Sequence, residues 1–281
     1  MTPLCLVALL AGADPAPRTP PAGPYAWVPE SCFKQLRARA AALKIADPTQ
    51  PPGGGPSYLY QPAFAIDHTL RLPARPYQPQ PGDIMLATDG SLFWTLMHNA
   101  AGTSHPTHSG VFFAMPDGRM AILEGGPHDT MRCRILEAIP HLASYEAEGR
   151  VWVRPRSCPL TPEQSRRLTE FALAVDLRKF GIGRLGVQLT PFRTRGPVRT
   201  AFVGKPNGLD RDSYFCSELV CEAAVYAGLL DATTTRPSAT YPRDLFFGAS
   251  LNPYINRHLK MVGWEPPSRW TGAPVVMDSR R

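Results

Sequence analysis

A cysteine stands at the start of a segment with strong helical patterning, residues 212–228. Asp212 or Ser213 is a typical helix N-cap, and Gly228 is a typical residue to end a helix. A thiol in the first turn of a helix meets the positive end of the helix dipole and several unsatisfied backbone N–H groups, which favour the thiolate form. Cys216 is therefore predicted to be a nucleophile.

The same segment predicts how this helix packs. Its apolar residues recur at helical spacing and are predicted to be buried, whereas Glu218 and Glu222 are expected to point elsewhere. The predicted buried stripe consists of Cys216, Leu219, Val220, Ala223, Ala224 and Ala227. Because cysteines are often buried for packing alone, Cys221 is expected only to pack or to form a disulfide. A catalytic role for Cys216 thus requires a base from elsewhere in the chain.

A predicted β-hairpin upstream supplies that base. Its strands cover 108–114 and 120–124, and the proline and glycine between them are typical of a type I turn followed by a left-handed residue. A three-residue loop would place Glu124 opposite Gly110, so that His108 is its diagonal neighbour on the same face. In this register Glu124 can fix the tautomer of His108 and direct the other ring nitrogen toward a nucleophile. A shift of one residue would turn Glu124 to the other face.

Further elements are predicted from turn and capping residues. They are a helix over 30–44, a strand after Gly82 and Asp83, a helix from Ser91 to Gly102, a strand over 150–154, a helix from Thr161 to about 180 and a turn at 241–245. The irregular stretch 181–211 precedes the cysteine helix. Long loops in compact domains are often functional, so this stretch is predicted to form a wall of a substrate groove.

The chain divides into four predicted segments. Residues 1–13 are short and apolar and end in small residues, as in a signal peptide, which would place the protein outside the cell or in the cell envelope. No positive charge precedes them, so a cytoplasmic location is the alternative. Residues 14–79 form a Pro/Gly-rich extension, 80–265 a catalytic domain and 266–281 a loose C-terminal tail. No segment is long and apolar enough to predict a transmembrane span.

Composition excludes one class of partner. The chain has 30 basic and 23 acidic residues, giving a net charge of +7, but no basic run interleaved with aromatic residues. A nucleic-acid partner is therefore not predicted. A hydrophobic content of 43% is enough for a substantial core. The pairing of Cys32, Cys133, Cys158 and Cys221 stays open, from two disulfides in an oxidising compartment to none in a reducing one.

Histidine-rich segments raise the question of a metal site. The candidates are His98, His105, His108 and His128. No Cys-x-x-Cys or His-x-x-x-His pair accompanies them, so neither a metal nor another cofactor is predicted. His98 is expected on a helix surface instead.

Several short motifs, taken in their order along the chain, resemble those of a known family. They are Gly82-Asp83-Ile84, His108-Ser109-Gly110-Val111, Glu124, Tyr214-Phe215-Cys216-Ser217-Glu218-Leu219-Val220 and Pro242-Arg243-Asp244-Leu245. Together they resemble the permuted papain-like amidases of the YiiX/YaeF-like branch of the NlpC/P60 superfamily, in which histidine precedes cysteine. The resemblance implies an α+β, circularly permuted papain-like fold with a small antiparallel sheet and packed helices.

The resemblance also implies roles for four residues. Cys216 is the expected nucleophile, His108 the general base and Glu124 its orienting partner, while Tyr214 is a neighbour expected to help bind the oxyanion. The implied reaction is cleavage of an amide bond through a thioester, on a peptide or acyl-lipid substrate such as a cell-wall peptide or a lipid-linked molecule.

Three alternatives stay open. The same residues could act on a lipid ester, as in lecithin:retinol acyltransferase-like proteins, although the Asn-Cys-Glu-His signature of that branch is absent. Cys32 could serve His108 as nucleophile, although Glu30 and Lys34 beside it make a poor packing surface. The domain could also be a binding module that has lost catalysis. The sequence leaves the substrate and the oligomeric state undetermined.

Overall fold

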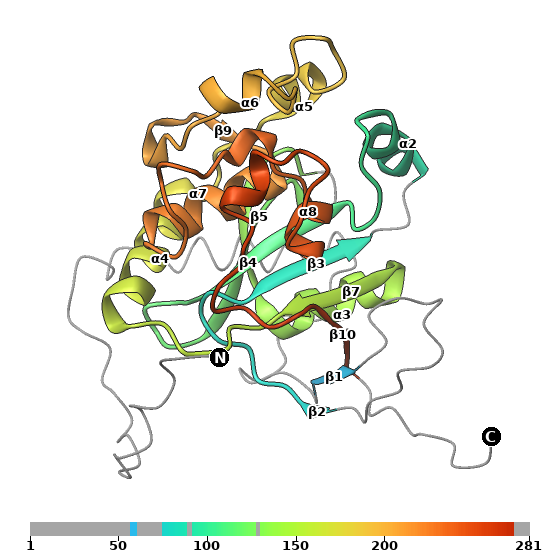
Figure 1. Cartoon of the computed structure of the whole chain (residues 1–281). Helices are drawn as coiled ribbons and strands as arrows, with labels where there is room; N and C mark the ends of the chain where they lie inside the picture. Colours follow the sequence, from blue (N-terminus) through green and yellow to red (C-terminus); the bar gives the residue numbers. More distant parts are fainter. Residues whose placement is uncertain (1–56, 61–74, 89–91, 128–129, 273–281) are drawn as a thin grey trace, which may run out of the picture.

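A computed structural model describes residues 57–60, 75–88, 92–127 and 130–272. These residues form an α+β fold around an eight-stranded sheet with strand order β2-β1-β10-β7-β3-β4-β5-β6, in which every neighbouring pair is antiparallel (Figure 1). The strands are β1 (Tyr58–Tyr60), β2 (Arg75–Pro76), β3 (Ile84–Thr88), β4 (His108–Ala114), β5 (Met120–Gly125), β6 (Cys133–Glu137), β7 (Arg150–Arg154) and β10 (Ser268–Thr271). Two short parallel strands, β8 (Lys179–Phe180) and β9 (Ser213–Tyr214), pair separately.

Helices cover both faces of the sheet. The helices are α2 (Leu92–Ala100), α3 (Ala138–Glu148), α4 (Pro162–Val175), α5 (Ile182–Val187), α6 (Arg199–Phe202), α7 (Cys216–Tyr226) and α8 (Pro242–Phe247), with short 3-10 turns η3 (Gly208–Asp210), η4 (Pro237–Ala239) and η5 (Ile255–Arg257). Because side chains alternate along a strand, Val111 and Leu123 face the core shared with α4, α7 and α8. Phe112 and Ile122 face the second core, which α3 covers.

The predicted hairpin is confirmed with its register. Gly110 pairs with Glu124 and Ala114 with Met120, and the N–H of Met115 donates to the carbonyl of Arg119 across the turn at 2.7 Å. Alternation therefore places His108 and Glu124 on the same side of the sheet as Phe112 and Ile122, which is the side of α3.

The cysteine helix is confirmed, but it begins later than predicted. Neither Asp212 nor Ser213 is its N-cap, because residues 213–214 pair as a strand with β8 and keep the chain extended up to Phe215. The N-cap is Phe215, whose N–H donates to the Glu218 side chain at 3.3 Å. The helix ends at Tyr226, two residues before Gly228, which has a φ of 71°.

The predicted stripe on α7 is buried, and its two glutamates point elsewhere as predicted, into ion pairs with the 181–211 stretch. Glu218 and Glu222 are both fully buried. Arg184 and Arg211 make ion pairs with Glu218, and Arg211 makes a second one with Glu222. These arginines come from the 181–211 stretch, which holds α5, α6 and η3 and is not wholly irregular. The long loop is thus fixed to the cysteine helix by buried charge.

Two other boundaries differ from the predictions. The Thr161 capping box is present, but α4 ends at Val175, because Leu177 has a φ of 68° and β8 follows. The predicted turn at 241–245 is the start of helix α8, where the Asp244 carboxylate accepts from the N–H of Tyr241 at 2.9 Å.

The sheet extends beyond the predicted domain of residues 80–265. Strands β1 and β2 come from the predicted extension, and β10, from the predicted loose tail, pairs with β1 and β7. Trp270 of β10 is fully buried, which explains the pairing, because its ring fills the core on the α3 side. The predicted signal peptide, the helix over 30–44 and Ser91 lie outside the described residues. Within the described residues, no helix has the length and apolar character to span a membrane.

Candidate functional site

Cys216 is the first residue of α7 and retains 7% of its surface exposed. Its sulfur lies 4.0 Å from the carbonyl oxygen of Thr107, the residue immediately before β4. The first backbone N–H groups of a helix have no acceptor within the helix, so they are available to an anion beside the sulfur. The structure therefore brings the predicted nucleophile to the beginning of the strand that carries the predicted base.

His108 joins the sulfur to Glu124. Its Nε2 atom lies 2.5 Å from Oε2 of Glu124, and the ring is within hydrogen-bonding reach of the Cys216 side chain. With Nε2 engaged by the carboxylate, Nδ1 is the ring nitrogen left to face the sulfur. Cys216 comes from a helix on one face of the sheet and Glu124 points to the other. His108, at the first position of β4, contacts both.

The charges of this site are strongly coupled. Burial lowers the pKa of His108, but hydrogen bonds to Cys216 and Glu124 outweigh it and raise the pKa from the usual 6.5 to about 10. Burial likewise raises the pKa of Glu124, yet the charges and hydrogen bonds of His141 and His108 hold it well below its usual range. The geometry therefore favours a carboxylate and a protonated imidazole at neutral pH.

Two residues of α3 complete the surroundings of Glu124 and were not predicted. His141 makes an ion pair with Oε1 of Glu124, and the Tyr145 hydroxyl donates to Oε2 at 3.2 Å. The Tyr145 ring also stacks on His108, with ring centroids 5.6 Å apart. The two residues are four apart on one helix, so they share a face, and His-x-x-x-Tyr in an apolar segment was the signal that could have identified them.

Close packing around the site depends on two glycines. A Cβ at Gly110 would lie 2.7 Å from Cγ2 of Ile122 and 3.2 Å from Cγ of Glu124, so these two side chains fill the space beside Gly110. A Cβ at Gly125 would lie 3.4 Å from the backbone nitrogen of Cys216. The absence of side chains at these positions lets the start of α7 and the Glu124 side chain approach the sheet.

Tyr214 is not positioned as its predicted role requires. Its side chain is fully buried against Phe171, and its hydroxyl donates to the carbonyl of Gly208 at 2.7 Å. The single hydroxyl proton is therefore already used, and the phenol anchors the loop before β9 instead of supplying a donor for an oxyanion.

The two other motifs hold the fold. The fully buried Asp83 carboxylate accepts from the Tyr77 hydroxyl at 2.7 Å and from the N–H of Arg156 at 2.6 Å, and burial raises its pKa to about 6. Asp244 pairs with Arg195, in addition to capping α8. Neither carboxylate contacts Cys216 or His108.

The remaining cysteines and histidines do not form a second site among the described residues. Cys133 and Cys221 are free thiols, and burial raises the pKa of Cys221 well above its usual value. His98 is buried beside the Tyr241 ring, not on a helix surface as expected. No group of three metal-ligating side chains occurs in the described ranges. Cys32 and His128, which belong to the alternative sites, lie outside them.

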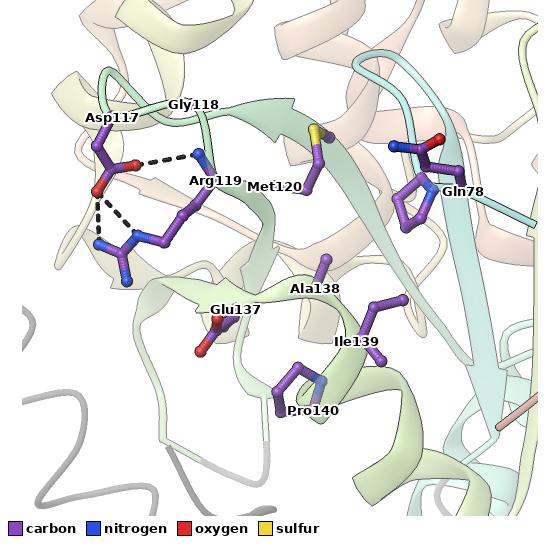
Figure 2. A pocket seen from close by; sticks show the side chains of 10 residues that line it. Gln78, Asp117, Gly118, Arg119, Met120, Glu137, Ala138, Ile139 and Pro140 are labelled. Atoms are coloured by element: carbon purple, nitrogen blue, oxygen red, sulfur yellow. Dashed lines mark hydrogen bonds and ion pairs between the residues drawn. The ribbon is translucent and has the colours of Figure 1, made fainter. Parts of the chain in front are cut away.

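A pocket of about 470 Å³ lies at the opposite end of the hairpin from the site. Its lining residues are Gln78, Pro79, Asp117, Gly118, Arg119, Met120, Glu137, Ala138, Ile139 and Pro140 (Figure 2). None of them is a predicted site residue. Met120, which lines the pocket, and Glu124 are four residues apart on β5, so the pocket is roughly 14 Å from Glu124 along the strand.

Comparisons with known proteins are sparse. No protein-family model matches the chain, and no curated protein is similar to it at a significant level. A crystal structure of the metalloprotein YiiX from Escherichia coli O157:H7 is similar over 54% of this chain and 67% of that protein, with 19% sequence identity and a TM-score of 0.36. YiiX gives its name to the branch that the sequence motifs resemble, but a likeness of this size establishes neither a shared fold nor a shared family.

Proposed function

We propose that this protein is a cysteine-dependent hydrolase of the permuted papain-like type, which cleaves an amide bond through a thioester. The observation that carries the proposal is the chain of contacts from Cys216 to His108 to Glu124, with the sulfur at a helix start and the imidazole held by a buried carboxylate. This is the arrangement that activates a thiol in cysteine hydrolases.

In the first step, the sulfur of Cys216 attacks the substrate carbonyl carbon while His108 holds the proton. A C–S bond forms, and the carbonyl oxygen becomes an oxyanion beside the first-turn N–H groups of α7. When the C–N bond breaks, His108 donates its proton to the leaving amine. The acyl group then remains on Cys216 as a thioester.

In the second step, His108 takes a proton from water, and the water oxygen attacks the thioester carbonyl. A C–O bond forms, the C–S bond breaks, and the free acid leaves. Cys216 returns to the thiolate and His108 to the imidazolium, so no cofactor is needed. Glu124 stabilises the protonated imidazole in both steps without exchanging a proton itself.

We further propose that the substrates are cell-wall peptides or lipid-linked molecules and that the protein works in the cell envelope or outside the cell. An ester of a lipid is the alternative substrate, because the same attack on an ester carbonyl releases an alcohol in place of an amine.

The test is covalent labelling of the full chain with a thiol-directed acyl probe. We expect the parent to be labelled and Cys216→Ser to be unlabelled. Cys221→Ser, in the same helix, and Cys158→Ser, at a half-buried position, are matched controls that should keep the parent rate. Cys32→Ser tests the alternative nucleophile.

Labelling that persists in Cys216→Ser would refute the assignment, and its loss only in Cys32→Ser would transfer the role to that residue. If Cys216 is labelled but neither peptide amides nor lipid esters are turned over, the domain is a binding module that kept its thiol. Peptidoglycan stem peptides and lipid esters, assayed in parallel, decide between the two substrate classes.

A further inference from the structure

The stretch 182–202 presents apolar side chains to solvent and polar ones to the interior. Val187, Phe192, Val198 and Phe202 are exposed, the last at 75%. Its buried positions are polar instead, and the polar residues bond to one another, Gln188 to Thr194 and Thr200 to the Thr194 carbonyl. A segment that packs on a core shows the reverse pattern. Here the hydrogen bonds between the buried polar residues fix the backbone so that the apolar side chains point to solvent.

Helix α2 adds to the same surface. Leu92 and Leu96, four residues apart on one face of α2, are 72% and 58% exposed. The helix is linked to the segment before α5, because the Trp94 ring meets the Phe180 ring edge-on at 6.4 Å. Helices α2, α5 and α6 lie at the same end of the molecule in Figure 1.

Exposed apolar residues concentrate there. Of the thirteen large hydrophobic side chains exposed in the described residues, eight belong to this apolar surface: Leu92, Leu96, Ile182, Val187, Leu189, Phe192, Val198 and Phe202. Monomeric proteins rarely expose so many large apolar side chains on neighbouring segments, and such a concentration marks an interaction site.

The charge of this segment is one-sided. Residues 177–209 contain seven basic side chains and no acidic one. Arg184 and Arg195 are used in ion pairs with Glu218 and Asp244. Arg193 and Arg199 are exposed and make no ion pair with any described residue, so their charge faces outward among the phenylalanines. Exposed phenylalanine and aliphatic side chains combined with arginine fit the interface of an anionic bilayer.

The apolar surface adjoins the candidate site. The N–H of Gly181, which precedes α5, donates to the carbonyl of Tyr214 at 2.9 Å, two residues before Cys216. Arg184 of α5 bonds to Ser213 as well as to Glu218. On the other side, α2 is followed by the loop that leads to Thr107 and His108. A bilayer or a molecule bound to the apolar surface would therefore lie close to the sulfur of Cys216.

We propose that the apolar surface docks peripherally on an anionic phospholipid bilayer and so presents a membrane-embedded molecule to Cys216. The docking itself does not rest on the proposed chemistry, because it needs neither the thiol nor the imidazole. A Cys216→Ser variant is therefore expected to bind vesicles as the parent does, which separates failure of this proposal from failure of the hydrolase assignment.

The test is sedimentation of the full chain with vesicles of phosphatidylglycerol and phosphatidylcholine, compared with phosphatidylcholine alone. We expect binding to the anionic vesicles that weakens with added salt. We expect the partition coefficient to fall at least about tenfold in each of two double variants. Phe192→Ser/Phe202→Ser removes two apolar side chains from the bilayer interface. Arg193→Glu/Arg199→Glu removes two basic residues, each of which contributes roughly fivefold near an anionic surface.

Val262→Ser is the matched control, because this side chain is 80% exposed but does not belong to the apolar surface. The control should bind like the parent. Absence of parent binding, or equal loss in the control, would overturn the proposal.

Two other occupants of the apolar surface would be recognised by further measurements on the parent and the Phe192→Ser/Phe202→Ser variant. If Phe192→Ser/Phe202→Ser turns a dimer into a monomer in sedimentation velocity while the parent ignores vesicles, the surface binds a second copy. If the same variant unfolds at a lower temperature and the parent ignores vesicles, another part of the chain covers the surface. Either result would replace the bilayer.

Discussion

The two ends of the β4–β5 hairpin each carry a charged pair, but in different environments. At one end His108 contacts Glu124, with side-chain exposures of 13% and 0%. At the other, beside the turn, Arg119 contacts Asp117 at 2.7 Å, with exposures of 28% and 48%. The pKa of Asp117 is lowered, because hydrogen bonds to Arg119 outweigh its partial burial.

The difference shows that the strength of each charged pair follows the burial of its side chains and not the presence of a pocket beside it. The pocket of about 470 Å³ lies at the Asp117 end, where water screens the charges. The sulfur lies at the Glu124 end, where little solvent reaches the imidazole and its pKa is about 10. The pocket and the proposed catalytic residues therefore lie at opposite ends of this hairpin.

The largest expected effect separates the two ends by activity. His108→Ala should lower turnover by about 10²–10⁴-fold, the usual contribution of a general acid–base. Arg119→Ala, in the pocket, should leave turnover near the parent value. Both turnover numbers are obtained from steady-state rates on the substrate identified by probe competition. An equal loss of turnover in Arg119→Ala and His108→Ala would contradict the assignment of the chemistry to the His108 end.

Stability should follow the same division. Glu124→Gln leaves the buried His141 and the largely buried His108 without their carboxylate and is expected to reduce the free energy of unfolding by about 3–5 kcal/mol. Asp117→Asn should cost less than about 1 kcal/mol, because its pair is exposed to solvent. Urea unfolding at neutral pH gives both values, and equal losses would mean that burial does not distinguish the pairs.

The pH dependence sharpens the comparison further. Since the folded-state pKa of His108 lies above its unfolded value, the stability it contributes is complete below about pH 6.5 and is lost as pH rises through about 10. Activity that requires the imidazolium should fall over the same alkaline range. In Glu124→Gln this alkaline limb should move to lower pH, whereas in Asp117→Asn it should stay in place. A limb that Glu124→Gln does not shift would show that another group titrates.

Each end of the hairpin also has a glycine that can be tested. Gly110→Ala places a methyl group 2.7 Å from Ile122, so we expect a loss of about 1–3 kcal/mol from overpacking, together with reduced turnover as Glu124 is displaced. Gly118→Ala meets no atom within 4 Å but must adopt a φ of 85°, for a cost of about 1–2 kcal/mol with turnover retained. Thermal unfolding and turnover measured together distinguish displacement of the site from turn strain.

The smallest expected effect concerns the support from α3. Tyr145→Phe removes one hydrogen bond of 3.2 Å to Glu124 and keeps the ring that stacks on His108. A hydrogen bond to a charged group contributes about 1.5–3 kcal/mol, and this bond is long while both histidines still hold Glu124, so turnover should fall by about tenfold or less. A loss as large as that of His108→Ala would place the Tyr145 hydroxyl in the chemistry itself.

Local rules in the sequence determined the hairpin register and the cysteine helix. The turn between β4 and β5 fixes the loop length, and strand alternation then sets Glu124 on the same face as His108. The spacing of apolar residues identified the buried stripe of α7, and Gly228 indicated its end. These features depend on neighbours in the chain, and so they could be predicted without knowing the fold.

Only the tertiary structure brought α3 and the 181–211 stretch to the site. His141 and Tyr145 reach Glu124 because α3 packs on the sheet face opposite α7, and no local pattern specifies which face a helix covers. Glu218 is buried despite its polarity, because two arginines of the 181–211 stretch neutralise it in the interior. Packing and charge pairing between distant segments decided these contacts, because both depend on which surfaces remain to be covered once the sheet has formed.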